Sequence, residues 1–379
     1  MTVLAPDSYS YRGEADRSAG RSLRIGMIAP PWFGVPPAAY GGIESMVASL
    51  VDGLVARGHH VTLVGAGPRA TSAQRYTSVY PEPPSARLGD PVPEVVHAAA
   101  AASALEGEAI DVVHDHTLAG PLLARGRTAP TLVTAHGPVT GELGDYLGHL
   151  GTTVEVVAIS DAQRRLRPGL NWVSTVHNGV DVASFPLGHG DGGYLLFLGR
   201  FNPEKGAHLA IDVAKELGCR LVLAGKLNER EEKEYFASAI SPRLGAGVDY
   251  VGEADAATKR QLYAGARALL FPVCWEEPFG MVMVEAMACG TPVVALRRGS
   301  VPEVVVDGET GFVVDDPADL VGAVRSVDHL DRGACRAHAE RHFDTARMVD
   351  GYEATYRMIV EAEELRLDAR PDHPALLSI

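Results

Sequence analysis

The sequence lacks the features that mark disulfide-built, zinc-bound and membrane-spanning proteins. Its 379 residues include four cysteines, and no two of them form a C-x-x-C pair, so there is no disulfide or zinc framework to interpret. A reducing cytoplasm is therefore the expected setting. No run of about 18 apolar residues occurs, and no transmembrane helix is expected. Residues 1–22 mix both charges without an apolar core, which predicts a mobile tail and not a signal peptide.

Basic residues are in the minority. The chain has 34 lysines and arginines against 48 aspartates and glutamates, a formal net charge of -14. This excess argues against a nucleic-acid partner and against a strongly anionic membrane as a ligand, because both carry negative charge. It leaves room for a local basic pocket that binds a phosphate. The hydrophobic content of 46% is ordinary for a globular protein, and the length predicts about two or three domains.

A repeated alternation of strand and helix patterns predicts an α/β fold. Residues 23–29 form an apolar strand pattern, residues 43–55 repeat apolar side chains at helical spacing, and residues 61–64 form the next strand pattern. This order implies a parallel sheet. The alternation of strand and helix patterns is interrupted by a Gly-, Ser- and Pro-containing linker at 183–193 and begins again at Tyr194. The sequence thus predicts two Rossmann-like parallel-sheet domains that face a central crevice, a favoured place for a ligand.

The first strand is not followed by the G-x-G-x-x-G fingerprint of dinucleotide-binding domains. Glycines come later, at Gly41 and Gly42, where the next helix begins. They would let a phosphate approach the free N–H groups of that helix. The alternative is a flexible loop that needs glycine only for its turn. Residues 65–93, rich in Pro, Gly, Ser and Arg, are interpreted as an irregular excursion.

Histidines end two predicted strands of the first half. DVVHDH ends in His114, Asp115 and His116, and the strand pattern at 131–137 carries His136. Ligands gather at the carboxyl ends of parallel strands. His114 and His116 would lie on one face of an extended chain, but two imidazoles and one carboxylate are few ligands for a metal. A strand end that faces an acceptor is the favoured interpretation.

Residues 276–295 carry two carboxylates, Glu277 and Glu285, around the start of a predicted buried helix. A carboxylate in a buried helix is costly without a partner, so Glu285 needs a ligand hydroxyl or a cation. Glu277 precedes the helix, beside free N–H groups that form an anion site. Those groups belong to Phe279, Gly280, Met281 and Val282. The alternatives are a structural salt bridge for Glu285 and a simple loop charge for Glu277.

Two cations follow the first predicted strand of the second half. Arg200 offers a planar fork, and Lys205 is a point charge at a helix start. Together they suit a diphosphate. A solvated surface pair is the alternative, and it is weakened because the same half also supplies Glu277 and Glu285.

With these motifs the chain resembles the retaining glycosyltransferases of family 4, which have the GT-B fold of two Rossmann-like domains. The most specific part of this resemblance is the combination of the E-x7-E and R-x4-K motifs. The resemblance spans about residues 23–362. The matching pieces are GGIE at 41–44, TAHG at 134–137, HNGVD at 177–181, GRFNPEKG at 199–206, LAG at 223–225 and EPFGMVMVEAMACGTPVVA at 277–295.

The resemblance implies a division of the chain and of its tasks. Residues 23–183 would form the acceptor domain and residues 193–345 the nucleotide-sugar donor domain. Within residues 346–379 a final helix would cross back to the acceptor domain.

The resemblance also implies residue roles in the donor site. Arg200 and Lys205 would hold the donor diphosphate, which Gly41 and Gly42 approach from the other domain. The backbone amides of residues 279–282 would face the donor.

Three further side chains receive roles from the same resemblance. Glu285 would bind the ribose hydroxyls, and Glu277 the hydroxyls of the transferred sugar. His136 would contact the donor sugar or lie beside the reacting centre. Catalytic roles are thus expected for Glu277, His136, Arg200 and Lys205.

The expected activity is transfer of a hexosyl group, with retention, from a UDP- or GDP-linked sugar to a hydroxyl acceptor. That acceptor is a small molecule or lipid-linked, and peripheral membrane contact is compatible with it. No D-x-D stands at a corresponding loop, so Arg200 and Lys205 would replace a metal, and no cofactor is expected. The alternatives are a sugar-nucleotide 2-epimerase of the same architecture and a non-catalytic nucleotide-binding module. These motifs specify neither the donor base nor the oligomeric state.

Overall fold

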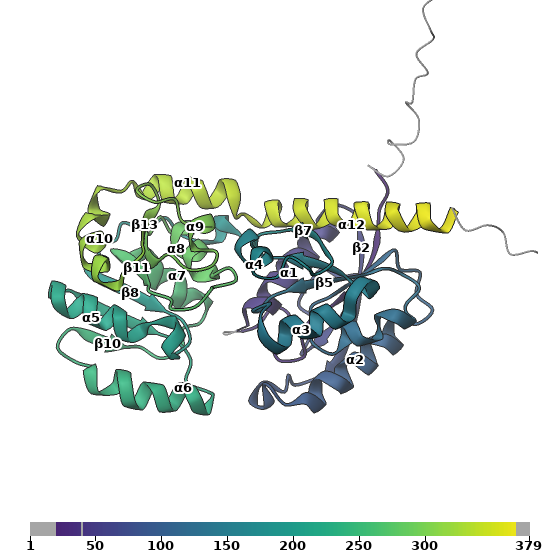
Figure 1. Cartoon of the computed structure of the whole chain (residues 1–379), viewed down its shortest axis with the longest axis horizontal. Coiled ribbons are helices and arrows are strands. Elements are labelled where there is room, and N and C mark those ends of the chain that lie inside the picture. The colour runs from purple at the N-terminus through teal and green to yellow at the C-terminus, as the bar shows by residue number, and fades with distance from the viewer. Residues whose placement is uncertain (1–19, 39–40, 369–379) are drawn as a thin grey trace, which may run out of the picture.

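The computed structural model describes residues 20–38 and 41–368, and in this part of the chain two parallel sheets form two halves (Figure 1). The N-terminal sheet has the strand order β3-β2-β1-β4-β5-β6-β7, and the C-terminal sheet has the order β10-β9-β8-β11-β12-β13. Because every neighbouring pair of named strands is parallel, the predicted α/β architecture is confirmed. Most of the predicted tail, residues 1–19, and the residues after 368 lie outside the described residues.

The N-terminal half contains seven strands and four α-helices in the described residues. Its strands are β1 (Arg24–Ile28), β2 (His60–Ala66), β3 (Arg75–Tyr80), β4 (Val112–Asp115), β5 (Thr131–Ala135), β6 (Glu155–Ala158) and β7 (Trp172–Thr175). Its helices are α1 (Gly42–Ala56), α2 (Pro91–Leu105), α3 (Gly141–Leu150) and α4 (Asp161–Leu166). The helical spacing predicted for residues 43–55 is confirmed, because Met46, Leu50 and Leu54 of α1 are buried against this sheet's core.

The C-terminal half has six strands and seven α-helices among the described residues. The strands are β8 (Tyr194–Leu198), β9 (Arg220–Ala224), β10 (Val248–Tyr250), β11 (Ala268–Phe271), β12 (Val293–Leu296) and β13 (Gly311–Val314). The helices are α5 (Ala207–Leu217), α6 (Arg230–Tyr235), α7 (Ala256–Gly265), α8 (Met281–Ala288), α9 (Val301–Val304), α10 (Leu320–Ser326) and α11 (Arg332–His342).

The interpretation of residues 65–93 as wholly irregular was wrong. This segment contains β3, which pairs with β2 at the edge of the sheet. None of the six residues of β3 is buried, so it lacks the alternation of apolar and polar residues that marks a half-buried strand. The following helix, α2, also begins inside this segment, at Pro91, where the Asp90 side chain accepts a hydrogen bond from Val92 N.

The last helix, α12 (Thr345–Asp368), starts beside the C-terminal half and runs along the N-terminal half (Figure 1). It packs on α1. Its buried stripe consists of Met348, Tyr352, Tyr356 and Ile359. Among residues 20–38 and 41–368, no helix has the combination of length and apolarity needed to span a membrane.

The contact between α1 and α12 leaves no room for a side chain at Gly53. A Cβ atom there would lie 2.5 Å from Val349 Cγ2. We therefore predict that Gly53→Val lowers the free energy of unfolding by about 1–3 kcal/mol through overpacking. Gly322→Ala in α10 is the control, because a Cβ there meets nothing within 4 Å and should raise stability slightly. Urea denaturation measures both, and equal effects would contradict the close packing.

Candidate active site

A cleft between the two halves contains two adjoining compartments. The first compartment has a volume of about 220 Å³ and the second about 540 Å³. Both are lined by Gly42 of α1, by Arg200 after β8, and by Met281 and Val282 of α8. The cleft therefore receives residues from both halves of the chain, and these shared residues form the junction of the compartments.

The start of α8 contributes backbone N–H groups at this junction. Gly280 adopts a left-handed conformation with φ of 79° just before the helix, where a Cβ would lie 2.7 Å from Met283 Cε. Helix α8 then begins at Met281, directly after this glycine. The first N–H groups of a helix have no partner inside the helix and attract negative charge. The junction is thus suited to a phosphate.

Lys205 and Glu277 form an ion pair in the second compartment. Lys205 Nζ lies 2.5 Å from Glu277 Oε2, which also accepts a hydrogen bond from Trp275 Nε1 at 2.8 Å. Lys205 Nζ is also 4.9 Å from the centre of a Trp275 ring. The structure brings together two residues that the sequence singled out 72 positions apart. Their contact fixes the position of the ammonium group at the wall of the cleft.

Glu285 lines the first compartment and has two partners within the protein. Its Oε1 atom lies 2.8 Å from Lys259 Nζ, and its Oε2 atom accepts a hydrogen bond from the Tyr263 hydroxyl at 2.8 Å. Burial, reinforced by the Glu285 carboxylate, raises the pKa of Tyr263 well above its usual value. The predicted need for a partner is met by Lys259 and Tyr263, which sequence reasoning missed. Both residues belong to α7, whereas Glu285 belongs to α8. A sequence pattern within one helix could therefore not reveal this contact.

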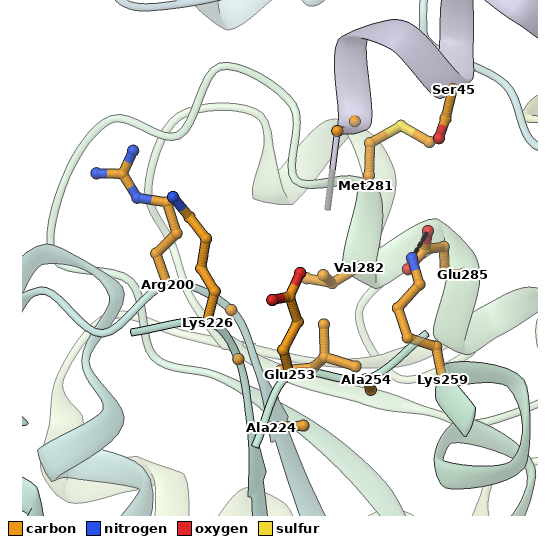
Figure 2. Close-up of a pocket in the computed structure, with 15 residues that line it drawn as sticks. Ser45, Arg200, Ala224, Lys226, Glu253, Ala254, Lys259, Met281, Val282 and Glu285 are labelled. Carbon is orange, nitrogen blue, oxygen red and sulfur yellow. Dashed lines mark hydrogen bonds and ion pairs between the residues drawn. The ribbon is translucent and has the colours of Figure 1, made fainter. Parts of the chain in front are cut away.

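Lys226 is a second cation that sequence reasoning missed. It directly follows the LAG motif at the carboxyl end of β9, and that position was the available signal. Its ammonium group pairs with Glu229 and lies 3.9 Å from Glu232 Oε1, which is 3.4 Å from Arg200 Nε. Figure 2 shows Arg200 and Lys226 on one side of the first compartment and Glu285 with Lys259 on the other.

Glu253 lies between these two sides of the first compartment (Figure 2). Sequence reasoning did not identify it, although it too follows a strand of the C-terminal sheet, β10. Its carboxylate adds hydrogen-bond acceptors to a pocket whose other charged walls are mainly basic.

Gly41 and Gly42 stand where the sequence places them, before and at the start of α1, and both line the first compartment. Gly41 has φ of 144°, and a Cβ there would lie 2.8 Å from Pro37 Cβ. Nothing within 4 Å would meet a Cβ at Gly42, so the backbone there is open to the cleft. The neighbouring Glu44 is buried, and desolvation raises its pKa to about 7.

His136 lies at the border between the second compartment and a third pocket of about 150 Å³. Its Nε2 atom is 2.9 Å from His116 Nδ1. The adjacent backbone is held by Gln163 Nε2, which donates to the carbonyl oxygens of Ala135 and Gly137. Burial lowers the pKa of His136 to about 3. A neutral imidazole therefore faces the cleft at neutral pH.

The side chains of His114, Asp115 and His116 do not converge on one point. His114 contacts the Tyr356 hydroxyl and Thr134 Oγ1, whereas Asp115 pairs with Arg127 at 2.8 Å. Within the described ranges, no group of three or more His, Cys, Asp and Glu side chains is arranged to hold a metal ion.

Comparisons with known proteins identify the same sequence regions. Residues 40–184 match the family model "Glycosyltransferase Family 4", and residues 183–339 match "Glycosyl transferases group 1". A phosphatidyl-myo-inositol mannosyltransferase of Mycolicibacterium smegmatis is 30% identical over 359 residues, covering 84% of this chain and 89% of that protein. A glycogen synthase of Mycobacterium tuberculosis is 28% identical, covering 80% of this chain and 86% of that protein.

Solved structures show the same architecture. The glycosyltransferase AviGT4, involved in avilamycin A biosynthesis, has a TM-score of 0.67 and 27% identity, covering 89% of this chain and 98% of that one. A sucrose-phosphate synthase of Thermosynechococcus elongatus has a TM-score of 0.71 at 20% identity, covering 92% of this chain and 100% of that one. The second likeness concerns the fold alone.

The buried Glu44 generates a prediction about pH. Its pKa is about 7 in the folded chain against an ordinary value of 4.5, so between these pH values the folded state holds a proton that the unfolded state has lost. The free energy of unfolding should therefore fall, by up to about 3 kcal/mol, as the pH rises through this window. Glu44→Gln removes this contribution and should gain stability relative to the original chain as the pH rises from 4.5 to 7.

Urea denaturation at several pH values measures this difference. Glu82→Gln, at an exposed loop position, is the control and should follow the original chain. If Glu44→Gln keeps a constant offset from the original chain across the window, the raised pKa is wrong.

Proposed function

The chain belongs to the family 4 glycosyltransferases, and from this premise we propose that it transfers a hexosyl group from a nucleoside diphosphate sugar to a hydroxyl acceptor. We propose further that the transfer retains the anomeric configuration and needs no metal ion. The observation that carries the proposal is the junction of the two compartments, which is lined by Arg200 and by Met281 and Val282 at the start of α8. Lys226 borders this junction in the first compartment, and Lys205 borders it in the second.

A donor diphosphate fits this junction. Its negative charge would be balanced by Arg200, Lys205 and Lys226 together with the start of α8. The nucleoside would then occupy the first compartment, where Glu285 would accept hydrogen bonds from ribose hydroxyls, and Gly42 would allow close approach from the N-terminal half. The transferred sugar would occupy the second compartment, beside Glu277, Asn178 and His136.

The proposed acceptor carries an apolar part next to its reacting hydroxyl. The third pocket adjoins the second compartment at His136 and is lined by Leu118, Leu143 and Leu147. Leu118 is 51% exposed and Leu143 is 39% exposed, so apolar surface extends from this pocket to the outside of the molecule. The mannosyltransferase relatives are named for a phosphatidyl-myo-inositol. Both features favour a lipid-linked acceptor or an amphipathic small molecule.

Breaking the sugar–phosphate bond leaves negative charge on the departing diphosphate and positive charge on the anomeric carbon. The fixed cations stabilise the former without reorganising, because carboxylates already hold them in place. Glu277 Oε2 is occupied by Lys205 and Trp275, which favours an orienting role over that of a covalent nucleophile. Retention would then proceed by attack on the front face, with the leaving phosphate oxygen taking the acceptor proton.

The test is incubation of the purified protein with UDP- and GDP-hexoses and a panel of amphipathic and polar hydroxyl acceptors. We expect transfer in the presence of EDTA, and a product whose anomeric proton coupling matches that of the donor. Donor epimerised without transfer would replace the proposal with an epimerase. A strict need for a divalent metal would overturn the metal-independent mechanism.

Lys205 is expected to act mainly in the transition state. Lys205→Met keeps an unbranched aliphatic side chain but removes the charge, which should cost on the order of 2 to 4 kcal/mol of transition-state stabilisation. That loss corresponds to roughly 30- to 1000-fold in kcat. Lys215→Met, on the exposed face of α5, is the matched control and should be active. Steady-state kinetics that show an unchanged kcat for Lys205→Met would reject this role.

Lys226 is expected to act in donor binding. Lys226→Met should weaken binding of the nucleoside diphosphate about tenfold, since one charge-assisted contact is lost. Lys233→Met on α6 is the control, because Lys233 is exposed and lies outside the lining of the first compartment. Calorimetric titration of UDP and GDP measures both variants. Equal affinities for the two variants would remove Lys226 from the donor site.

A further inference from the structure

A buried chain of three side chains leads from the interior of the N-terminal half to the cleft. Met27 Sδ lies 3.2 Å from His116 Nε2, and His116 Nδ1 lies 2.9 Å from His136 Nε2. Met27 is in β1, His116 follows β4 and His136 follows β5. These strands are neighbours in the sheet. The side chains of Met27 and His116 are almost inaccessible, with exposed fractions of 0% and 5%, whereas His136 lines the cleft.

Met27, at the interior end of this row of side chains, determines which ring nitrogens of the two histidines carry hydrogens. A thioether sulfur has no hydrogen to donate and can only accept. The hydrogen of the contact between Met27 and His116 must therefore be on His116 Nε2. A neutral imidazole carries a single N–H, so His116 Nδ1 is an acceptor, and His136 must donate from Nε2.

His136 is then left with a lone pair on Nδ1. Among residues 20–38 and 41–368, no hydrogen bond engages that atom. Burial holds the pKa of His116 well below its usual value and that of His136 at about 3. Both rings therefore stay neutral at physiological pH, so each ring carries a single N–H.

His114 supports the arrangement without competing for these protons. Its ring centre is 3.8 Å from that of His116, and its two nitrogens are engaged by the Tyr356 hydroxyl and Thr134 Oγ1. Thr134 Oγ1 also lies 3.0 Å from the Tyr352 hydroxyl. The His116 ring is thus packed against a hydrogen-bond network that includes Tyr352 and Tyr356 of α12.

We propose that Met27 and His116 are positioning residues that set His136 in its Nε2–H form, so that its Nδ1 atom accepts a hydrogen bond from a substrate hydroxyl. This rests on the proposed function, since the hydroxyl belongs to the transferred sugar or to the acceptor. In the opposite form His136 would present an N–H at Nδ1 and could only donate. Met27 in β1 thereby decides whether His136 Nδ1 accepts a hydrogen bond from a substrate hydroxyl or donates one to it.

Removing the Met27 sulfur should abolish the preference of His136 for its Nε2–H form. In Met27→Leu the pair of rings can keep its hydrogen bond in either direction, because His116 Nδ1–H can donate to His136 Nε2 just as well as the reverse. The two forms then become close in energy, and His136 should populate the Nδ1–H form. Met287→Leu is the matched control, since Met287 is equally buried and its sulfur accepts no hydrogen bond within the described residues.

The first experiment is long-range 1H–15N correlation NMR of the full chain with 15N-labelled histidine, which reports each tautomer directly. His136→Gln and His116→Asn assign the two rings. We expect both rings as Nε2–H in the original chain and in Met287→Leu, and a mixture of forms in Met27→Leu. His136 as Nδ1–H in the original chain, or an unchanged spectrum in Met27→Leu, would overturn the proposal. This readout needs no substrate, so it stands apart from any failure of the proposed function.

The second experiment compares two substitutions of His116. Asn at this position can present its Oδ1 atom where His116 Nδ1 accepts, whereas Leu has no acceptor. His116→Leu should lower kcat about tenfold, the effect of one hydrogen bond, with the donor KM unchanged. His116→Asn should recover most of the loss, which a purely structural role would not produce. Thermal unfolding verifies that both variants are folded. Equal kcat values for His116→Leu and His116→Asn would then contradict the positioning role.

Discussion

Parallel strand pairing is the constraint on which the rest of this molecule depends. Because neighbouring strands in both sheets run in the same direction, their carboxyl ends meet at one edge, and the residues that follow them can reach a common cleft. His136 follows β5, Arg200 follows β8 and Lys226 follows β9. Residues far apart in the sequence are therefore brought to one place by backbone hydrogen bonding between the strands that precede them.

Charge around the cleft follows a second rule, in which three buried carboxylates of the C-terminal half lie against its cations. Glu277 holds Lys205, Glu285 holds Lys259, and Glu232 lies close to both Arg200 and Lys226. Ion pairs of this kind add little net stability, because desolvation offsets much of their attraction. What they provide is position, since a cation that is already held needs no reorganisation when negative charge arrives. This explains why a chain with a net charge of -14 can have a cleft suited to a diphosphate.

Local pattern was enough to predict the two parallel sheets, a buried helix after Glu277, and the presence of Arg200, Lys205 and Glu277 in one half of the chain. It could not reveal the partners of Glu285, because Lys259 and Tyr263 reach it from another helix. Nor could it find β3, whose exposed residues carry no periodic signal. The contact between His116 and His136 depends on β4 and β5 being neighbours, and a strand order of this kind is a property of the whole sheet.

The two halves are joined by two chain segments that pair with each other. Val180 N donates to Phe343 O, and Thr345 N donates to Val180 O, both at 2.9 Å. The second segment continues into α12, whose Tyr352 and Tyr356 close the hydrogen-bond network around His114. Thus the helix that returns from the C-terminal half also orders the histidines of the N-terminal half. The cations come from one half and His136 from the other, so their relative position depends on this paired crossing and on the packing of α12.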